Sequence, residues 1–468
     1  MPAVQLQLVG PSYTSRTTPL NAQVTRNFYP EPSRNGLSDS ALLSWPGAKL
    51  FSEGASPNRG ILEEPWKGCI FVVNGTNLVK IDSDGSRTNV GAIPGNARCV
   101  MTAASFYIYI VTEGLVFRSD GVTVEAVTDI DLESPNSVAF LNSQLIYDGN
   151  EGRFATSTPG DGSEIDGLDY ATAESRPDEL IRVYTFNQVA FMMGATSGEP
   201  WYNSGVGNPP FDRIDGGLFH VGIAGIHSIT NTDNALYFLG HDRSVYRLDG
   251  YTPVPISTVA ISNAIEQYER VDDCFAYSLR LQGQNYVVLT FPEANKTWVY
   301  SETIGEWFEI ASGVDGGRHI ANGYCFAFGK HLITDYRNGN VYEWDLGTFS
   351  DNGETILRER VTQPFHGDSI GAPGNMIFWN SIELVINSGK GLITGQGSAP
   401  QIMMSYSDDG GYTWSQEIWA PAGRLGAYQL KVEWHNLGAS INRMYRFKVS
   451  DPIEFHMFKL YADIEAGL

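Results

Sequence analysis

One short hairpin pattern recurs along the first three-quarters of this 468-residue chain. Each copy has an apolar run, a turn that contains Gly, Asn or Asp, and a second apolar run that ends in Asp. Clear copies span residues 71–82, 109–121, 236–250 and 332–345, and looser ones centre near Phe140, Val189 and Val288. Such segments are typical of antiparallel β-hairpins, because Gly, Asn and Asp tolerate the backbone conformations that tight turns require.

The spacing of these copies limits the architecture. Successive copies are roughly 40–45 residues apart, which is the length of one four-stranded propeller blade. A small sheet cannot bury both of its faces alone, whereas sheets packed radially around an axis hide them. The 50 Gly, 23 Pro and 12% aromatic residues fit many short strands and tight turns. We predict an all-β fold with a β-propeller of six or seven blades, six favoured, over residues 61–350. The alternative is a run of meanders that does not close.

The two ends of the chain differ from this repeat. Residues 1–60 are rich in Pro, Asn and Ser and lack periodicity, so we expect an N-terminal extended arm that wraps other parts of the molecule. After Asp345 longer alternating stretches appear, as in residues 382–386 and 428–434. Residues 351–468 are therefore predicted to form a separate C-terminal antiparallel domain, similar to a β-sandwich. The best helical pattern is short and covers residues 261–270.

The charge balance argues against tight binding of DNA. The chain has 31 basic and 53 acidic residues, a formal net charge of −22. A protein that grips DNA gains its affinity from Lys and Arg side chains that neutralise phosphates. An acidic surface instead favours solubility, or forms a wall past which nucleic acid slides without adhering.

Neither a secretory signal nor a membrane span is indicated. The N-terminus lacks a basic region followed by an apolar core, and no run approaches about 18 apolar residues. The cysteines are far apart and lie in or beside apolar runs, so we expect buried, reduced thiols at Cys69, Cys99, Cys274 and Cys325. The sequence predicts a soluble protein that is made in a cytosol.

One turn motif in the C-terminal region is specific. Residues 407–414 match the Asp-box pattern, whose fixed positions are Ser407, Asp409, Gly411, Thr413 and Trp414. The Asp carboxylate can accept backbone N–H bonds across a hairpin turn, Gly permits a positive φ, and Trp can pack beneath the turn. We predict that this Asp box stabilises a hairpin and has no catalytic role.

The Asp box also occurs in sialidases, which are propellers, so a β-propeller glycan-binding or sialidase-like tail enzyme is the alternative function. Sialidases usually repeat the box and carry an early Arg-Ile-Pro or Arg-Leu-Pro tripeptide. This chain has one box, outside the predicted propeller, and no such tripeptide. Residues 161–167 lack the ligand pattern of a calcium loop and are expected to form a solvated acidic loop. No nucleophile elbow or zinc motif is present, so we predict no catalytic residue, metal site or cofactor.

Several segments in a fixed order resemble the packaged-DNA-stabilisation family of short-tailed bacteriophages, whose members form the tail nozzle or hub. The resemblance is carried by residues 173–180, 199–203, 208–211, 216–222, 233–251, 255–258, 335–339, 400–414 and 446–452. The first 60 residues are similar only through residues 27–30 and 45–47.

The resemblance implies a structural role in the virion tail, after assembly in the bacterial host cytoplasm. Members of this family form a homo-hexamer below the portal and the head-to-tail adaptor protein, line the DNA exit channel, retain packaged DNA and take part in its ejection. They contact tail fibres or spikes and a plug or needle protein. The resemblance thus implies weak contact with passing duplex DNA, no membrane insertion by this chain and no active site.

Overall fold

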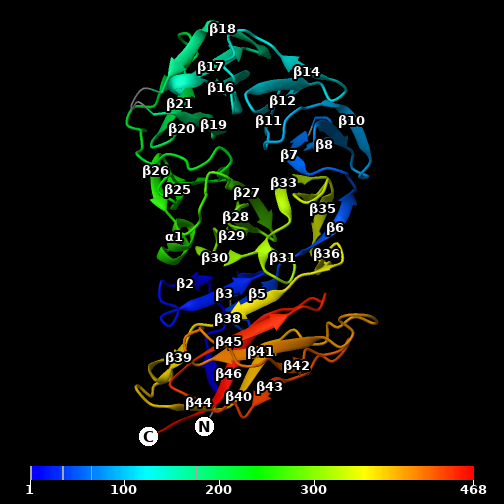
Figure 1. Cartoon of the computed structure of the whole chain (residues 1–468), viewed down its shortest axis with the longest axis vertical. Coiled ribbons are helices and arrows are strands. Elements are labelled where there is room, and N and C mark those ends of the chain that lie inside the picture. Colours follow the sequence, from blue (N-terminus) through cyan, green and yellow to red (C-terminus); the bar gives the residue numbers. More distant parts are fainter. Residues whose placement is uncertain (1–2, 34–35, 65, 174–177, 468) are drawn as a thin grey trace.

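The computed structural model describes residues 3–33, 36–64, 66–173 and 178–467. Figure 1 shows a ring of blades, a sandwich below it, and N-terminal strands between the two. The predicted all-β fold is confirmed. The described residues contain one α-helix and two 3-10 turns: α1 (Val259–Glu266), η1 (Asn150–Gly152) and η2 (Gly367–Ile370). The helix begins after Thr258, whose hydroxyl accepts the Ile261 N–H, two residues before the predicted start.

Six blades of the propeller each consist of four consecutive antiparallel strands. The first three blades are β7 (Asn58–Glu64), β8 (Cys69–Asn74), β9 (Asn77–Ile81) and β10 (Arg87–Ala92); β11 (Val100–Ala104), β12 (Tyr107–Thr112), β13 (Leu115–Ser119) and β14 (Val124–Val127); β15 (Val138–Leu141), β16 (Gln144–Asp148), β17 (Arg153–Thr158) and β18 (Asp161–Thr172). The next three are β19 (Leu180–Phe186), β20 (Val189–Gly194), β21 (Gly198–Asn203) and β22 (Phe211–Arg213); β23 (Ile229–Asn231), β24 (Leu236–Leu239), β25 (Val245–Asp249) and β26 (Thr252–Pro255); β27 (Phe275–Leu281), β28 (Gln284–Phe291), β29 (Lys296–Ser301) and β30 (Glu306–Glu309).

A further four-stranded unit, made from two distant parts of the chain, closes the ring. It contains β33 (Ala321–Ala327), β34 (Lys330–Asp335), β35 (Val341–Asp345) and β6 (Gly47–Ser52). β6 pairs antiparallel with β35, with Ala48 opposite Trp344. A Cβ at Gly47 would lie 2.5 Å from the carbonyl oxygen of Ser350, so glycine is required at this position. The range of six or seven blades is thus confirmed: six consist of consecutive strands, and the closing unit takes its outer strand from the N-terminal region.

The second strand of each blade is buried between its neighbours, which explains the continuous apolar runs of the hairpin pattern. In β8, Phe71 packs in one cluster with Ile108 of the next blade, whereas Val72 packs in another with Leu332 of the closing unit. Alternate side chains of one strand therefore contact opposite neighbours. The four cysteines are free and buried in these layers, as predicted.

The C-terminal sandwich has two sheets that share one hydrophobic core. One sheet contains β1 (Val4–Leu6), β4 (Phe28–Pro32), β5 (Ser40–Ser44), β40 (Ile377–Ile386), β43 (Val432–His435), β44 (Ala439–Ser440) and β46 (Met457–Ala466). The facing sheet contains β2 (Tyr13–Thr14), β3 (Ala22–Arg26), β38 (Arg358–Val361), β39 (Phe365–His366), β41 (Gln401–Ser407), β42 (Ile418–Pro421) and β45 (Asn442–Val449). Trp379 and Ile382 of the first sheet pack with Met404 and Phe447 of the second.

The residues expected to form an N-terminal extended arm are divided among these sheets. β1 pairs with β46, the β4–β5 hairpin joins the same sheet, and β6 closes the propeller. Four short strands between the units complete the fold: β31 (Ala311–Ser312), β32 (Gly317–Arg318), β36 (Ser350–Asp351) and β37 (Glu354–Thr355). Both units therefore include strands from residues 1–60.

Candidate functional site at the propeller–sandwich junction

The strand β3 joins the propeller to the sandwich. On one side Arg26 pairs in parallel with Glu309 of the blade strand β30, and on the other side β3 pairs antiparallel with β38. β38 in turn pairs with β45 of the sandwich. One hydrogen-bonded sheet thus runs from a propeller blade into the sandwich, across the narrow waist visible in Figure 1.

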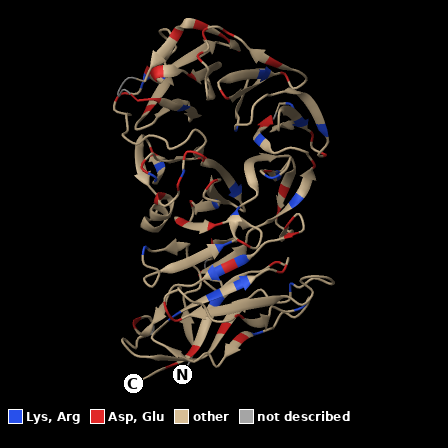
Figure 2. Cartoon of the chain, viewed as in Figure 1, with Lys and Arg blue, Asp and Glu red and all other residues tan. Residues whose placement is uncertain are grey.

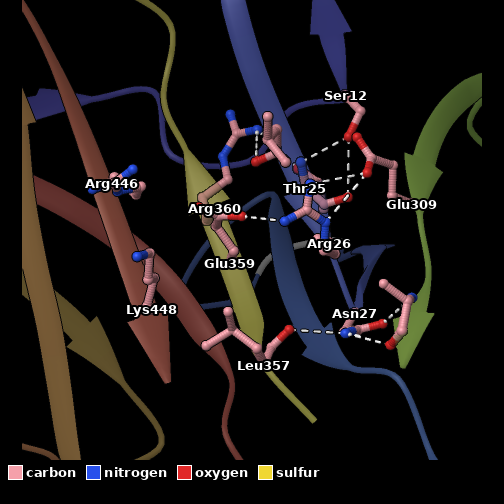
Figure 3. Close-up of polar contacts among 12 residues, drawn as sticks. Ser12, Thr25, Arg26, Asn27, Glu309, Leu357, Glu359, Arg360, Arg446 and Lys448 are labelled. Atoms are coloured by element: carbon pink, nitrogen blue, oxygen red, sulfur yellow. Dashed lines mark hydrogen bonds and ion pairs between the residues drawn. The ribbon is translucent and has the colours of Figure 1, made fainter. Parts of the chain in front are cut away.

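The side chain of Arg26 connects the strands on either side of it (Figure 3). Its Nη1 lies 2.6 Å from Glu359 Oε2, and its Nη2 lies 3.1 Å from Glu309 Oε2. The three side chains are largely shielded from water, with 16%, 11% and 9% of their surfaces exposed, respectively. Burial lowers the pKa of Arg26, but the two carboxylates more than offset this effect and raise it overall. The pairing compensates for the burial of three charges.

Arg360 of β38 organises the first residues of the chain. Its guanidinium is fully buried and donates to Leu8 O (2.7 Å), Gln23 Oε1 (2.7 Å) and Thr25 Oγ1 (2.8 Å). Burial lowers its pKa to about 9. Gly10 leaves room for this guanidinium, because the Cβ of any other residue at position 10 would lie 2.8 Å from Arg360 Nη2.

Asn27 completes the junction directly after β3. It has a φ of +57°, a conformation that Asn tolerates better than most residues. Its amide donates to Ala311 O (3.0 Å) and Leu357 O (2.8 Å) and accepts the Ala311 N–H (2.8 Å). The sequence indicated residues 27–30 only as a loose similarity, and no motif identified Arg26, Arg360 or Asn27 as junction residues.

The Asp box lies in the turn between β41 and β42, on the sandwich. The Thr413 N–H and hydroxyl donate to the Asp409 carboxylate at 2.9 and 2.6 Å. Ser407 Oγ donates to Asp409 Oδ1 and accepts the Gly411 N–H. Hydrogen bonds from Thr413, and then from Ser407, lower the pKa of Asp409 to about 2. Trp414 is only half-buried, and the Arg446 guanidinium lies 4.3 Å from its ring centre.

Other sequence features occupy unexceptional places. Residues 161–167, expected to form an acidic loop, instead begin the long strand β18. Among the described residues, no group of three or more His, Cys, Asp or Glu side chains is placed to hold a metal ion. No helix in the described ranges is long and apolar enough to cross a membrane. Figure 2 shows acidic and basic residues spread over the ring and the sandwich, with basic residues also prominent on the strands of the waist.

A buried carboxylate near the junction predicts a pH-dependent stability. Asp351 of β36 is 2% exposed, its Oδ2 accepts the Ser312 hydroxyl, and its Oδ1 lacks a partner. Burial raises its pKa from 3.8 to about 6. The folded state therefore binds this proton more tightly than the unfolded state, so stability falls as pH rises from about 4 to 6. Asp351→Asn should increase the free energy of unfolding by up to about 3 kcal/mol at pH 8 and change it little at pH 4.

Denaturation of the Asp351→Asn variant in urea at the two pH values measures this difference. The exposed Asp315→Asn variant is the matched control and should behave like the wild type at both. An equal effect of Asp351→Asn at pH 4 and pH 8 would contradict the assignment.

The solved structures that resemble this chain have low sequence identity to it. The WD40 domain of Neurospora crassa Pan2 is 8% identical, with a TM-score of 0.44 over 64% of this chain and 95% of that chain. BamB from Moraxella catarrhalis is 8% identical, with a TM-score of 0.40 over 74% and 98%. The computationally designed Ika8 protein is 11% identical, with a TM-score of 0.40 over 69% and 96%.

Two family models match the sequence in tandem. The model described as "Bacteriophage P22 Gp10, beta-propeller" matches residues 4–348. The model described as "Bacteriophage P22 Gp10, beta-sandwich" matches residues 365–465. A comparison with curated protein sequences finds no significant match. The first range covers the ring together with the N-terminal strands β1–β5 of the sandwich, and the second covers most of the remaining sandwich strands.

Proposed function

This chain belongs to the bacteriophage P22 Gp10 family of phage structural proteins, and we propose that it is the tail nozzle, or tail-hub, subunit of a short-tailed phage virion. In this role it lines and closes the DNA exit channel below the portal and adaptor, retains the packaged DNA and takes part in its ejection. The observation that carries the proposal is the match to both family units, in order, over residues 4–348 and 365–465.

We propose that the chain assembles as a homo-hexamer that contacts the head-to-tail adaptor, tail fibres or spikes, and a plug or needle protein. Exposed apolar side chains support contacts with other chains. On the sandwich they include Ile393, Trp419 and Tyr428, which are 83%, 60% and 68% exposed. On the propeller, Phe106 and Ile130 are 79% and 95% exposed. Contiguous exposed apolar patches mark sites of protein association, so we expect the contact surfaces where such side chains adjoin one another.

The junction suits a protein that must resist the pressure of packaged DNA. The sheet that includes β30, β3, β38 and β45 links the two units by backbone hydrogen bonds. The buried Arg26 network adds charge-assisted bonds across the same strands. We therefore expect the ring and the sandwich to move as one body during assembly and ejection.

We propose that the protein is not an enzyme. In its single Asp box, the Asp409 carboxylate accepts hydrogen bonds from Ser407 and Thr413 of the same hairpin turn. These bonds support a structural role for the motif. The alternative, a glycan-binding or sialidase-like tail enzyme, predicts turnover of sialosides or polysaccharide by the purified protein. Hydrolysis at a rate that is abolished in an Asp409→Ala variant with an unchanged melting temperature would favour that alternative.

The purified protein is expected to bind duplex DNA only weakly. The net charge of −22 makes tight contact with phosphates unfavourable, and a conduit must let the genome pass. Fluorescence anisotropy with a labelled duplex at about 0.15 M salt, where the Debye length is about 8 Å, measures this affinity. Tight binding that weakens steeply with salt would contradict a weakly interacting conduit.

Phage particles assembled without this protein test its retention role directly. They should package DNA and then lose it, and addition of the purified wild-type protein to freshly filled heads should reduce the loss. The amount of nuclease-accessible DNA over time is the measurement. Filled heads that remain stable without the protein would rule out the proposed role.

A further inference from the structure

Arg98 crosses the centre of the propeller. It precedes β11 of the second blade, yet its Nη1 and Nη2 donate to the Asn322 side chain (2.9 Å) and carbonyl (2.7 Å) in β33 of the closing unit. Its guanidinium carbon also lies 3.9 Å from the centre of the Phe275 ring, at the start of β27 in the sixth blade. Residues of these three blades meet only near the ring axis. The Arg98 side chain therefore links the inner strands of three blades.

Further cationic groups gather around Arg98. Arg182 belongs to β19, and His227 precedes β23. Burial, and then the charges of Arg98 and Arg182, lower the pKa of His227 well below its usual value. Burial, and then the charge of Arg318, lower the pKa of Arg98 to about 10. Arg98 thus lies within electrostatic range of Arg318 and His227, and His227 lies within range of Arg182.

This cluster has hydrogen-bond donors that the protein itself does not use. The Nε and Nη1 atoms of Arg182 and the Nε atom of Arg98 are inaccessible and lack hydrogen-bond partners. Asp148 is the carboxylate that acts on Arg182, but its oxygens accept the N–H groups of Asn136 and Ser137. Buried cationic donors without an acceptor are costly, so an anion that reached them would be held strongly.

A cavity adjoins this cluster: Tyr184 and Tyr277 line it, and they lie beside Arg182 and within electrostatic range of Arg98, respectively. It has a volume of about 690 Å³ and is lined by the inner strands β19, β23, β27 and β33. It opens beside Arg280 and Asp233, whose side chains are 68% and 75% exposed. Its wall also includes Tyr184, whose ring centre lies 5.9 Å from the Arg182 guanidinium carbon, and Tyr277, whose hydroxyl is buried without a partner.

We propose that the axial channel of the propeller binds an oxyanion, a phosphate or a carboxylate, through Arg182 and Arg98, with Arg318 adding positive charge nearby. A guanidinium group presents donors in a planar fork that matches both kinds of anion. Arg318 is stacked on Tyr336 at 3.5 Å and also faces Asp335 and Asp273, so its role is supporting. The anion is either a free phosphate or a carboxylate carried into the cavity by a polypeptide segment.

Isothermal titration calorimetry of the full-length protein at pH 7 tests this site. The probes are inorganic phosphate and an N-acetylated Gly-Gly-Glu peptide, with the uncharged Gly-Gly-Gln amide as the peptide control. Arg182→Gln should weaken binding by about tenfold or more, because a charge-assisted fork is lost. Arg280→Gln makes the same change in charge at the mouth of the cavity and should leave the affinity within about twofold of the wild type.

The two probes separate the two sources of the anion. Tighter binding of phosphate than of the peptide identifies a free ion, and the opposite order identifies a polypeptide carboxylate. The site is refuted if neither probe binds, or if Arg182→Gln binds as tightly as the wild type. Should Arg182→Gln fail to fold, hydrogen exchange of the wild type replaces it. Binding of the probe must then slow the exchange of backbone amides in β19 and in the segment before β11. Slower exchange in the sandwich alone would also refute the site.

Discussion

Arg26→Met should lower the free energy of unfolding by about 3–5 kcal/mol, because it leaves two largely buried carboxylates without their shared cation. Glu359 should be affected most, since Glu309 also lies 3.3 Å from Lys296. Methionine retains much of the side-chain volume, so the loss reports on charge more than on packing. Urea denaturation at pH 7, followed by circular dichroism, provides the measurement.

Two further variants show whether the loss comes from the junction. Arg16→Met removes an exposed arginine of the same N-terminal segment and should change stability by about 0.5 kcal/mol or less. Adding Glu309→Gln and Glu359→Gln to Arg26→Met should restore part of the lost stability, because no uncompensated charge then remains buried. If Arg26→Met and Arg16→Met unfold at the same urea concentration, the ion network contributes nothing to the junction.

Trp45→Ala should cost about 3–5 kcal/mol, the usual cost of removing a large buried aromatic side chain. Trp45 is 1% exposed and lies two residues before the start of the closing strand β6. Its ring centre is 5.5 Å from that of Trp344 and 5.7 Å from that of Tyr286, both in edge-to-face contact. The substitution leaves a cavity where the closing unit, with Trp344 on β35, meets the sixth blade, with Tyr286 on β28, and the melting temperature should fall.

Trp419→Ala is the matched control for Trp45→Ala. Trp419 is 60% exposed on the sandwich, so its removal should change the melting temperature little. Limited proteolysis adds a local readout, since loss of the β6–β35 pairing should expose residues 46–57 to cleavage. Equal melting temperatures for the two tryptophan variants would show that Trp45 does not hold the ring closed.

The blade repeat could be predicted from the sequence because it is a local property. A hairpin such as β8–β9 is encoded by adjacent apolar runs and by the turn between them, where Gly75 has a φ of +56°. The Asp box is local for the same reason, since its hydrogen bonds connect residues two to four positions apart. The net charge of −22, which argues against tight binding of DNA, follows from the amino-acid composition alone.

The positions of the N-terminal strands could not be predicted in this way. The alternating burial of β3 places Gln23 and Thr25 inside, so its buried face is polar and gives no hydrophobic period. The groups that bury these side chains come from far along the chain: Arg360 binds Gln23 and Thr25 across more than 330 positions. β6 likewise finds its partner strand almost 300 residues away.

The sequence by itself therefore determined the β-hairpins, their repeat and the Asp-box turn, because each depends on residues close together in the chain. Only the tertiary structure decided that the N-terminal residues close the ring and bridge it to the sandwich. It also decided that Arg26 and Arg360 become buried ion-pair and hydrogen-bond centres, and that Arg98 reaches Asn322 and Phe275 in other blades. Those outcomes depend on which distant backbone and side-chain groups surround each residue, and no local pattern of polarity encodes them.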